Sequence, residues 1–312
     1  MTTMTPRQRA ICALEGGIPD RIPTFELEFQ LSKDLLGKEW LFEQDLQGLS
    51  DAEIDRKLHE NAEYILQVYE KLEHDIIPVP YLREEFVFRS VKYMKEMVGD
   101  KYLFTAHGDG TYSIPDGNHM YDFAYRIADD MEGVLQDAEN MANGAIERNK
   151  RYLDHGVQSF ILCADYCYNS GPFVSPAMFA EIITPYLAKI IEEIRKGGGY
   201  AIKHTDGNIM PILDQLIEAK PHAIHSLDPM AGVDIAEVKR ITKGKCAIVG
   251  NVNCALLQTG TEEEIIESAM YAINSAKEGG GYIYSTSNVP FRGLPLDRYL
   301  LVLDVWKQHR DY

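Results

Sequence analysis

The sequence has few cysteines and no long apolar run. Its 312 residues include only five cysteines and two tryptophans, and such a sparse, odd set of thiols is typical of reduced cysteines rather than of a disulfide framework. No stretch approaches the ~18 consecutive apolar residues of a membrane-spanning helix, and the start MTTMTPRQRA has no apolar signal-peptide core. We therefore expect a cytoplasmic protein without a membrane partner.

Positive charge is also scarce. Lysine and arginine total 31 against 48 aspartates and glutamates, for a formal net charge of −17. A chain of this charge repels phosphate backbones and anionic lipid surfaces, so nucleic acid is not an expected partner. The 45% hydrophobic and 25% charged residues are ordinary for a globular enzyme. The length allows one large core, which predicts a single domain over residues 1–312.

Several catalytic fingerprints are absent from the sequence. It contains no G-x-G-x-x-G, no Walker A loop, no G-x-S-x-G elbow and no H-E-x-x-H helix. These absences disfavour a Rossmann dinucleotide site, a P-loop nucleotide site, an α/β-hydrolase nucleophile and a zincin metal site. No internal repeat or linker-like stretch marks a domain boundary either.

Short apolar runs that end in polar residues alternate with helical patterns in the second half of the chain. Alternation at this spacing is typical of right-handed βαβ units and a parallel sheet. The runs are 159–165, 200–206, 223–228, 246–253 and 282–288, and the helical patterns between and around them are 176–196, 209–219, 235–242 and 262–278.

The first half has clear helices and weaker strands. Helices are predicted over Thr5–Gly16, where Thr5 caps and Pro6 opens the helix, and over Asp51–Leu72 and Asp130–His155. Strand signals lie at 22–29, 76–81 and near Leu103, and residues 84–99 are expected to form a strand followed by a helix. With about eight strands in total, the sequence predicts a (β/α)₈ TIM-type barrel with an N-terminal helical segment of about residues 1–75 packed on it.

One apolar run ends abruptly in side chains that can bind or titrate. In Gly199–Pro211, GYAIKHTDGNIMP, the period of two places Ile202, His204 and Asp206 on one face of a strand. Taken alone, the pair is better interpreted as a core histidine and a helix-capping aspartate. The neighbouring strands have to decide between these interpretations.

Polar residues follow most of the predicted strands. Because parallel strands share a carboxyl face, these residues are expected to meet at one mouth. Each could be a cap or turn residue, but the joint pattern favours a site. The catalytic candidates are His204, Asp206 and Asp165, and the substrate-binding candidates are Glu26, His107, Tyr166, Asn169, Asp228, Asn251, Asn253 and Ser287.

A metal ion is one interpretation of this set. A carboxylate on an apolar strand is unfavourable unless it meets water, a donor or a metal, so Glu26 is expected to line the cavity. Glu26, His204 and Asp206 together offer the oxygen and nitrogen ligands that zinc accepts. Cys163 and Cys167 do not have a standard zinc spacing, and buried inert thiols are the simpler interpretation.

Five segments together resemble a known family. RQRAICALEGGIPDRIP, NSGPFVSPAMFAEIITPYLAKII, IKHTDGN, GNVN and GGGYIYSTSNVP are similar to the uroporphyrinogen decarboxylase superfamily, in particular its corrinoid-dependent methyltransferase branch. The resemblance is spread over nearly the whole chain. It implies a (β/α)₈ barrel with its site at the carboxyl ends of the strands.

Two branches of this superfamily fit the residues poorly. The decarboxylase branch carries an arginine-rich R-Q-A-G-R-Y motif for a substrate with eight carboxylates, whereas this first strand reads FELEFQ, and Glu26 and Glu28 would repel that substrate. The branch that methylates a thiol binds zinc through a His-x-Cys pair and a later Cys. Here Asp206 stands at the first Cys position, and only Ser285 and Ser287 lie near the second.

What remains resembles the methyltransferase I component of O-demethylase systems. The resemblance implies that a methyl group moves from an aromatic methyl ether to cobalt(I) in a separate corrinoid protein. Cobalt(I) is then the nucleophile, and the protein must supply a proton donor or a Lewis acid at the ether oxygen, for which His204 and Asp206 are the candidates. The alternatives are a decarboxylase or lyase acting on a small acid, and a non-catalytic ligand-binding barrel.

Overall fold

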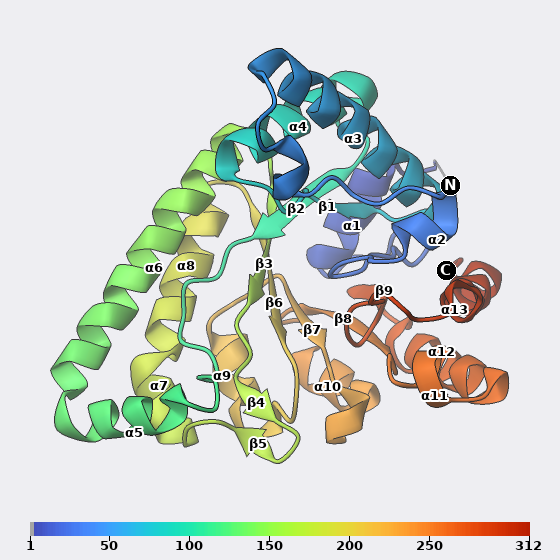
Figure 1. Ribbon diagram of the computed structural model, residues 1–312. Coiled ribbons are helices and arrows are strands. Elements are labelled where there is room, and N and C mark those ends of the chain that lie inside the picture. Colours follow the sequence, from blue (N-terminus) through green and yellow to red (C-terminus); the bar gives the residue numbers. More distant parts are fainter. Residues whose placement is uncertain (1–2) are drawn as a thin grey trace.

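A curled parallel sheet forms the centre of the molecule (Figure 1). The computed structural model describes residues 3–312. The order in the sheet is β1-β2-β3-β6-β7-β8-β9, so each strand pairs with the next main strand along the chain. The strands are β1 (Ile76–Pro78), β2 (Leu103–His107), β3 (Ser159–Cys163), β6 (Tyr200–Thr205), β7 (Ala223–Ser226), β8 (Ala247–Val252) and β9 (Tyr282–Thr286). A small antiparallel hairpin, β4 (Cys167–Tyr168) and β5 (Gly171–Pro172), follows β3.

Alternate residues of each strand face the inside of the curl. On β6, Ile202 joins an inner apolar cluster, whereas its neighbour Ala201 packs in the outer one. This alternation follows from the period of two of a strand and lets both faces be buried. The inner cluster also contains Phe25, Ile76, Leu103, Ile161, Ala223, Ala247, Val249 and Ile283.

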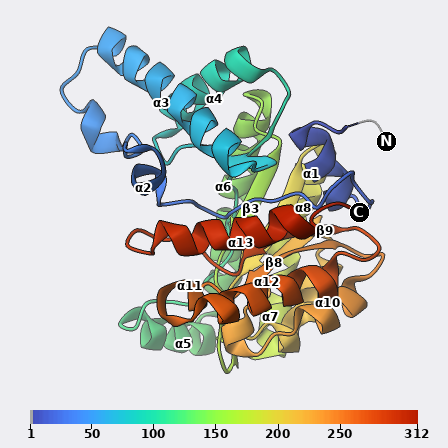
Figure 2. The ribbon, with the colours of Figure 1, turned by 90° about the vertical axis from the view of Figure 1, so that its right-hand side faces the viewer.

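Helices cover the outside of the sheet. Figure 2 shows α10, α12 and α13 side by side on one outer face. No helix among residues 3–312 is both long and apolar enough to cross a membrane. The helices after residue 80 are α4 (Glu84–Val98), α5 (His119–Asp129), α6 (Met131–Asp154), α7 (Pro176–Ile182), α8 (Thr184–Lys196), α9 (Leu213–Glu218), α10 (Ile235–Thr242), α11 (Leu256–Thr259), α12 (Glu262–Ala276) and α13 (Leu296–His309).

The N-terminal helices complete the core. Helix α1 (Pro6–Leu14) has the predicted Thr5 cap, here with a full capping box, and its Ala10, Ala13 and Leu14 enter the inner cluster. Helix α1 thereby closes the amino ends of the strands. Helix α2 (Ser32–Leu36) is short, and the amphipathic α3 (Asp51–Leu72) packs on α4.

The prediction of a strand over residues 22–29 is wrong. Residues 23–25 lie between β9 and the start of β1, where Tyr284 N–H donates to Pro23 O (2.8 Å) and Asp75 N–H donates to Thr24 O (2.8 Å). The ladder stops at Glu26 because its side-chain carboxylate accepts the Thr286 N–H that a continuing strand would bind. The sheet therefore has seven strands and a short bridging segment, and the predicted eight-stranded barrel is confirmed only in part.

Helix predictions needed smaller corrections. The predicted helix 176–196 is two helices that break at Ile183, just before Pro185, which has no N–H to continue the first helix. Residues 84–98 are helical from the first residue, without the expected strand. Helices α5 and α13 were not predicted.

A buried ion pair holds the bridging segment in place. The guanidinium of Arg9, only 4% exposed, lies 2.6 Å from Asp20 Oδ1 and 2.5 Å from Asp75 Oδ1. The second carboxylate oxygen of Asp75 accepts the Thr24 N–H (2.9 Å). Burial raises the pKa of Asp75 to about 6, although Arg9 and Arg21 act in the opposite direction. Helix α1, the bridging segment and β1 thus share one charge cluster.

Replacing Arg9 by alanine should strongly destabilise the fold. The change leaves the buried Asp75 carboxylate without its main counter-charge, and breaking a buried pair in this way costs roughly 3–5 kcal/mol. We expect a lower midpoint in urea unfolding. The matched control is Arg56→Ala, since the Arg56 side chain is 68% exposed in an i,i+4 pair and its loss should cost less than about 0.5 kcal/mol. Equal midpoints for the two variants would contradict this account.

Candidate active site

The inside of the sheet changes from apolar to polar toward the carboxyl ends of the strands. His204, His225 and Ser285 are buried. Each follows an inner apolar residue of its strand, on β6, β7 and β9 respectively, by two positions. Because a strand repeats every two residues, these side chains point to the same interior as the apolar layer. A polar layer therefore lies directly on top of the inner core.

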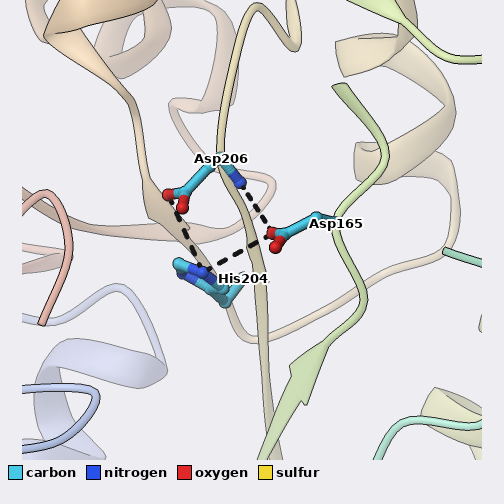
Figure 3. Close-up of side chains that lie close together, drawn as sticks. All are labelled: Asp165, His204 and Asp206. Atoms are coloured by element: carbon cyan, nitrogen blue, oxygen red, sulfur yellow. Dashed lines mark hydrogen bonds and ion pairs between the residues drawn. The ribbon is translucent and has the colours of Figure 1, made fainter. Parts of the chain in front are cut away.

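Three of the predicted catalytic residues meet at this end (Figure 3). The Nε2 atom of His204 lies 3.8 Å from Asp165 Oδ1 and 3.8 Å from Asp206 Oδ1. Asp165 follows β3 and its side chain is 48% exposed, Asp206 follows β6 at 30%, and the imidazole is 3% exposed. One ligand atom from each residue lies within 4.8 Å of the others. The structure thus places all three around one point at the mouth.

Hydrogen bonds orient both carboxylates. The Ser226 hydroxyl donates to Asp206 Oδ1 (2.7 Å) and Asn288 Nδ2 donates to Asp206 Oδ2 (2.6 Å). The backbone N–H of Asp206 donates to Asp165 Oδ1 (3.1 Å). Outer partners of this kind hold a ligating carboxylate in a fixed orientation.

His204 is bonded to a second histidine that the sequence reasoning missed. The two Nδ1 atoms of His204 and His225 are 2.7 Å apart, in neighbouring strands where the residues are register partners. Burial lowers the pKa of His204 to about 3 and that of His225 well below its ordinary value. Both rings are therefore neutral, and one Nδ1 must donate while the other accepts.

The surroundings of His225 decide which ring donates. Its Nε2 faces the Ser285 Oγ at 3.3 Å. The Ser285 hydroxyl has a closer acceptor in the Thr286 carbonyl (3.0 Å), so its proton is engaged there. The ring proton of His225 is therefore on Nε2, and its Nδ1 accepts from His204.

This direction of hydrogen bonding leaves the Nε2 of His204 without a proton. Its lone pair faces two carboxylate oxygens, so three acceptor atoms converge, and no group among residues 3–312 donates a hydrogen bond to this Nε2. Burial raises the pKa of Asp206 to about 6, with a further contribution from Asp165 and Asp228. Such a group is stabilised by a cation, either a proton or a divalent metal, and one imidazole with two carboxylates is a donor set that zinc accepts.

Glu26 does not join this group. It is 1% exposed, it accepts the Thr286 N–H (3.2 Å), and its Oε2 lies 3.1 Å from Ser285 Oγ and 2.5 Å from the Thr286 hydroxyl oxygen. Ser285 and His225 separate it from His204. Burial raises its pKa to about 8. The prediction that Glu26 lines the open cavity and ligates a metal with His204 and Asp206 is therefore corrected: it is an internal hydrogen-bonding residue of the polar layer.

His107 and Asp228 lie at the mouth with supporting contacts. The Nε2 of His107, exposed at the end of β2, is 2.6 Å from the Tyr81 hydroxyl, and the charge of His107 contributes to the low pKa of His204. Asp228 caps the turn after β7 and accepts the Gly207 N–H (3.3 Å). It therefore holds the loop that follows Asp206.

Tyr166 is turned away from the mouth, and Ser287 is buried in a backbone contact, contrary to prediction. Tyr166 is 0% exposed, and its ring lies in the outer core with the Lys203 ammonium 3.8 Å from the ring centre. The alternation of side chains reverses its direction relative to Asp165. Ser287 is 4% exposed and accepts the Cys254 N–H (3.3 Å). Both residues are structural in this geometry.

The three asparagines predicted to bind substrate lie in different places. Asn169 is exposed in the turn of the β4–β5 hairpin. Asn251 donates to the carbonyl that follows β7 (2.8 Å), so its amide links β7 and β8. Asn253 accepts the Ala255 N–H (3.0 Å) and caps the turn before α11. None of the three amides contacts His204, Asp165 or Asp206.

Lys203 is a second residue that the sequence reasoning missed. Its ammonium is fully buried on the outer face of β6, 3.0 Å from Asp109 Oδ2 and within hydrogen-bond distance of the carbonyls of Leu162 and Ala164. Asp109 belongs to the loop after β2. The pair fixes this loop against β6. In the sequence, the features that could have identified the buried polar residues of these strands were a lysine and two histidines inside apolar runs.

A small apolar pocket opens beside the mouth. Its volume is about 60 Å³, roughly the liquid volume of two waters, so it accommodates a substituent or the edge of a ring. Asn61 lines it and is 2% exposed, and its Nδ2 has no hydrogen-bond partner among the described residues. The other lining residues are Glu28, Trp40, Leu41, Phe42, Ile65, Tyr69, Pro78, Val79, Pro80 and Tyr81.

Fold and site together define a class: a TIM-like α/β protein with a polar site at the carboxyl ends of parallel strands. The sequence model of the uroporphyrinogen decarboxylase (URO-D) family matches residues 117–305, more than half of the chain. The chain therefore belongs to the URO-D family, as its sequence segments had suggested. Among curated proteins, no sequence matches the chain.

Solved structures share the fold. A methyltransferase from Methanosarcina mazei superposes with a TM-score of 0.74 at 15% identity, over 98% of this chain and 99% of that chain. At this identity the likeness shows the fold. D-psicose 3-epimerase from Clostridium cellulolyticum H10 superposes with a TM-score of 0.45 at 10% identity, over 80% of this chain and 90% of that one. With a TM-score below 0.5, it supports no argument about this chain.

The tautomers of the two histidines can be measured. At neutral pH, ¹⁵N NMR should show a protonated Nδ1 on His204 and a protonated Nε2 on His225, because Ser285 orients the second ring. Spectra of His204→Gln and His225→Gln would assign the signals. A proton on Nε2 of His204 would contradict the direction of hydrogen bonding described above.

Proposed function

We propose that this protein is a corrinoid-dependent methyltransferase that moves a methyl group from an aromatic methyl ether to cobalt(I) in a separate corrinoid protein. In this reaction the carbon–oxygen bond breaks and its electron pair stays on oxygen, while cobalt supplies the pair for the new cobalt–carbon bond. The observation that carries the proposal is the position of His204 Nε2, 3.8 Å from a carboxylate oxygen of Asp165 and 3.8 Å from one of Asp206.

This site is suited to stabilising a poor leaving group. A phenol has a pKa of about 10, so phenolate leaves slowly without help at the oxygen. A divalent metal such as zinc, bound here, would supply a Lewis acid for that oxygen. His204, Asp165 and Asp206 are the residues that would hold it, and Ser226 and Asn288 orient Asp206. Because His204 Nε2 carries no proton, the ligand role suits it better than that of proton donor.

The remaining residues position the substrate. Tyr81 and His107 stand at the mouth, and Tyr81 also lines the apolar pocket with Trp40 and Phe42. Aromatic walls suit a flat apolar group. The unpaired Nδ2 of Asn61 offers a hydrogen bond to an oxygen substituent. The methyl acceptor comes from outside, since none of the cysteines is activated: burial raises the pKa of Cys163 and Cys167 to about 12.

Family membership supports the proposal and also supplies the main alternative. A decarboxylase acting on a carboxylated substrate would need cations at the mouth, but Asp165, Asp206 and Asp228 face one another there. These carboxylates would repel an acidic substrate. The likeness to the Methanosarcina mazei methyltransferase is a further support for methyl transfer over decarboxylation.

Metal binding is the first expected property. Chelator-treated protein titrated with Zn²⁺ in a calorimeter at neutral pH should bind about one equivalent, because one imidazole and two carboxylates converge. Asp206→Asn should weaken binding by at least the 10–100-fold typical of losing an outer partner of a metal site. Asp154→Asn, on the exposed end of α6, is the control and should bind like the parent. Equal affinities in both variants would exclude this site.

Methyl transfer is the second expected property. Mixed with a reduced corrinoid protein and a phenyl methyl ether, the protein should convert cobalt(I) to methyl-cobalt(III), followed by absorbance. His204→Gln should slow this step at least roughly 100-fold, since the loss of a Lewis acid removes several kcal/mol of stabilisation. Asp154→Asn should retain the rate. Release of carbon dioxide from a carboxylated substrate without corrinoid would favour the decarboxylase instead.

A further inference from the structure

A second cavity lies at the opposite end of the sheet from His204. Its volume is about 800 Å³. It is bounded by the segments that precede β7, β8 and β9, by the end of α1 and by α10. Because these segments enter the strands, the cavity opens at the amino ends, whereas Asp165, His204 and Asp206 lie at the carboxyl ends. The two sites are separated by the inner apolar cluster.

Positive charge is concentrated around this cavity. Five basic side chains line it, Arg195, Lys239, Arg240, Lys243 and Lys245, against only two acidic ones, Glu15 and Glu278. Five minus two leaves a local charge of +3, in a chain whose net charge is −17. We call it the basic cavity. In so acidic a protein, a concave surface of opposite sign is suited to an anion.

The cations of the basic cavity have no acidic partners in the part of the chain that the structure describes. Arg195 donates to the Lys220 carbonyl (2.9 Å), and Lys239 donates to the Gly280 carbonyl. Burial and the neighbouring Lys243 lower the pKa of Lys239 to about 8. Neighbouring cations that have no acidic partner repel one another. An anion that binds between them therefore stabilises them.

Backbone and imidazole groups shape the same cavity. Gly279, Gly280 and Gly281 all have positive φ, and a Cβ at Gly280 would lie 2.1 Å from the Gly17 carbonyl oxygen, so no side chain can fill this wall. His222 Nδ1 accepts the Ala201 N–H (2.9 Å). Because burial keeps His222 neutral, with a pKa lowered to about 4, its Nε2–H is a further donor.

We propose that the basic cavity binds a compact anion that carries two or more phosphate groups. Its volume lies within the ~300–1,000 Å³ of small-molecule sites. Two linked phosphates carry roughly three negative charges at neutral pH, which matches the local excess of positive charge. Lysine and arginine side chains are the usual partners of such groups. A long nucleic acid is disfavoured because the rest of the surface repels it. This proposal is independent of the proposed methyl transfer.

Inorganic pyrophosphate is the probe. Chelator-treated full-length protein, titrated in a calorimeter at about 50 mM salt to limit screening, should show saturable binding of one equivalent. Lys243→Gln/Lys245→Gln, with both side chains exposed, should weaken binding roughly tenfold or more, because charged hydrogen bonds are lost. Lys33→Gln/Lys71→Gln makes the same charge change at exposed positions elsewhere and should keep the affinity within about twofold.

Three further measurements test the proposal: a folding control, a variant at the other end of the sheet and a second anion. Circular dichroism of the double variants verifies that they remain folded, and Asp206→Asn should bind pyrophosphate like the parent protein because it lies at the other end of the sheet. The absence of saturable binding, an equal loss in the control pair, or loss in Asp206→Asn would each overturn the proposal. Citrate binding as tightly as pyrophosphate would overturn the choice of phosphate.

Discussion

The hydrogen bond between His204 and His225 connects the core of this protein to its candidate site. Two neutral imidazoles meet through their Nδ1 atoms at 2.7 Å inside the sheet. A buried polar pair of this kind is tolerated because each ring nitrogen has a defined role, and Ser285, whose own proton is directed to the Thr286 carbonyl, sets the direction of the protons. The same direction leaves a lone pair at the mouth. The chemistry of the outer carboxylates therefore depends on groups deep in the sheet.

The polar layer also explains why the sheet does not close as eight regular strands. Glu26 places its carboxyl group where the next ladder bond would form, and this group accepts the Thr286 N–H and contacts the Thr286 hydroxyl. On the β1 side of the bridging segment, the buried ion pair of Arg9 and Asp75 joins α1 to the start of β1. One part of the RQRAICALEGGIPDRIP segment that indicated the family is thus explained by structure: Arg9 and Asp20 form ion pairs rather than catalytic contacts.

The two ends of the sheet have opposite electrostatic characters. Carboxylates converge at the carboxyl end, where the protein would attract a cation and repel acidic substrates. Cations converge at the amino end around the basic cavity. The apolar inner cluster lies between them and separates the two ends. Such a separation allows one fold to support two chemically different sites.

The sequence by itself determined the family, the alternation of strands and helices and the main catalytic candidates. Period-two apolar runs specify buried parallel strands, and their polar ends specify Asp165, His204 and Asp206, since parallel strands share a carboxyl face. Caps such as Thr5 were readable because they depend on a few neighbouring residues. These features are local or repeat along the chain.

Only the tertiary structure decided the partners of each side chain. His225, Lys203 and Asp109 acquire their roles from strand register and from loops distant in sequence, which no local pattern specifies. Tyr166 follows Asp165 directly, yet it points into the outer core because successive side chains diverge. Glu26 was recognised as unusual, but its acceptor role depends on Ser285 and Thr286, some 260 residues away along the chain. Contacts of that range are set by packing, and packing is a property of the folded chain as a whole.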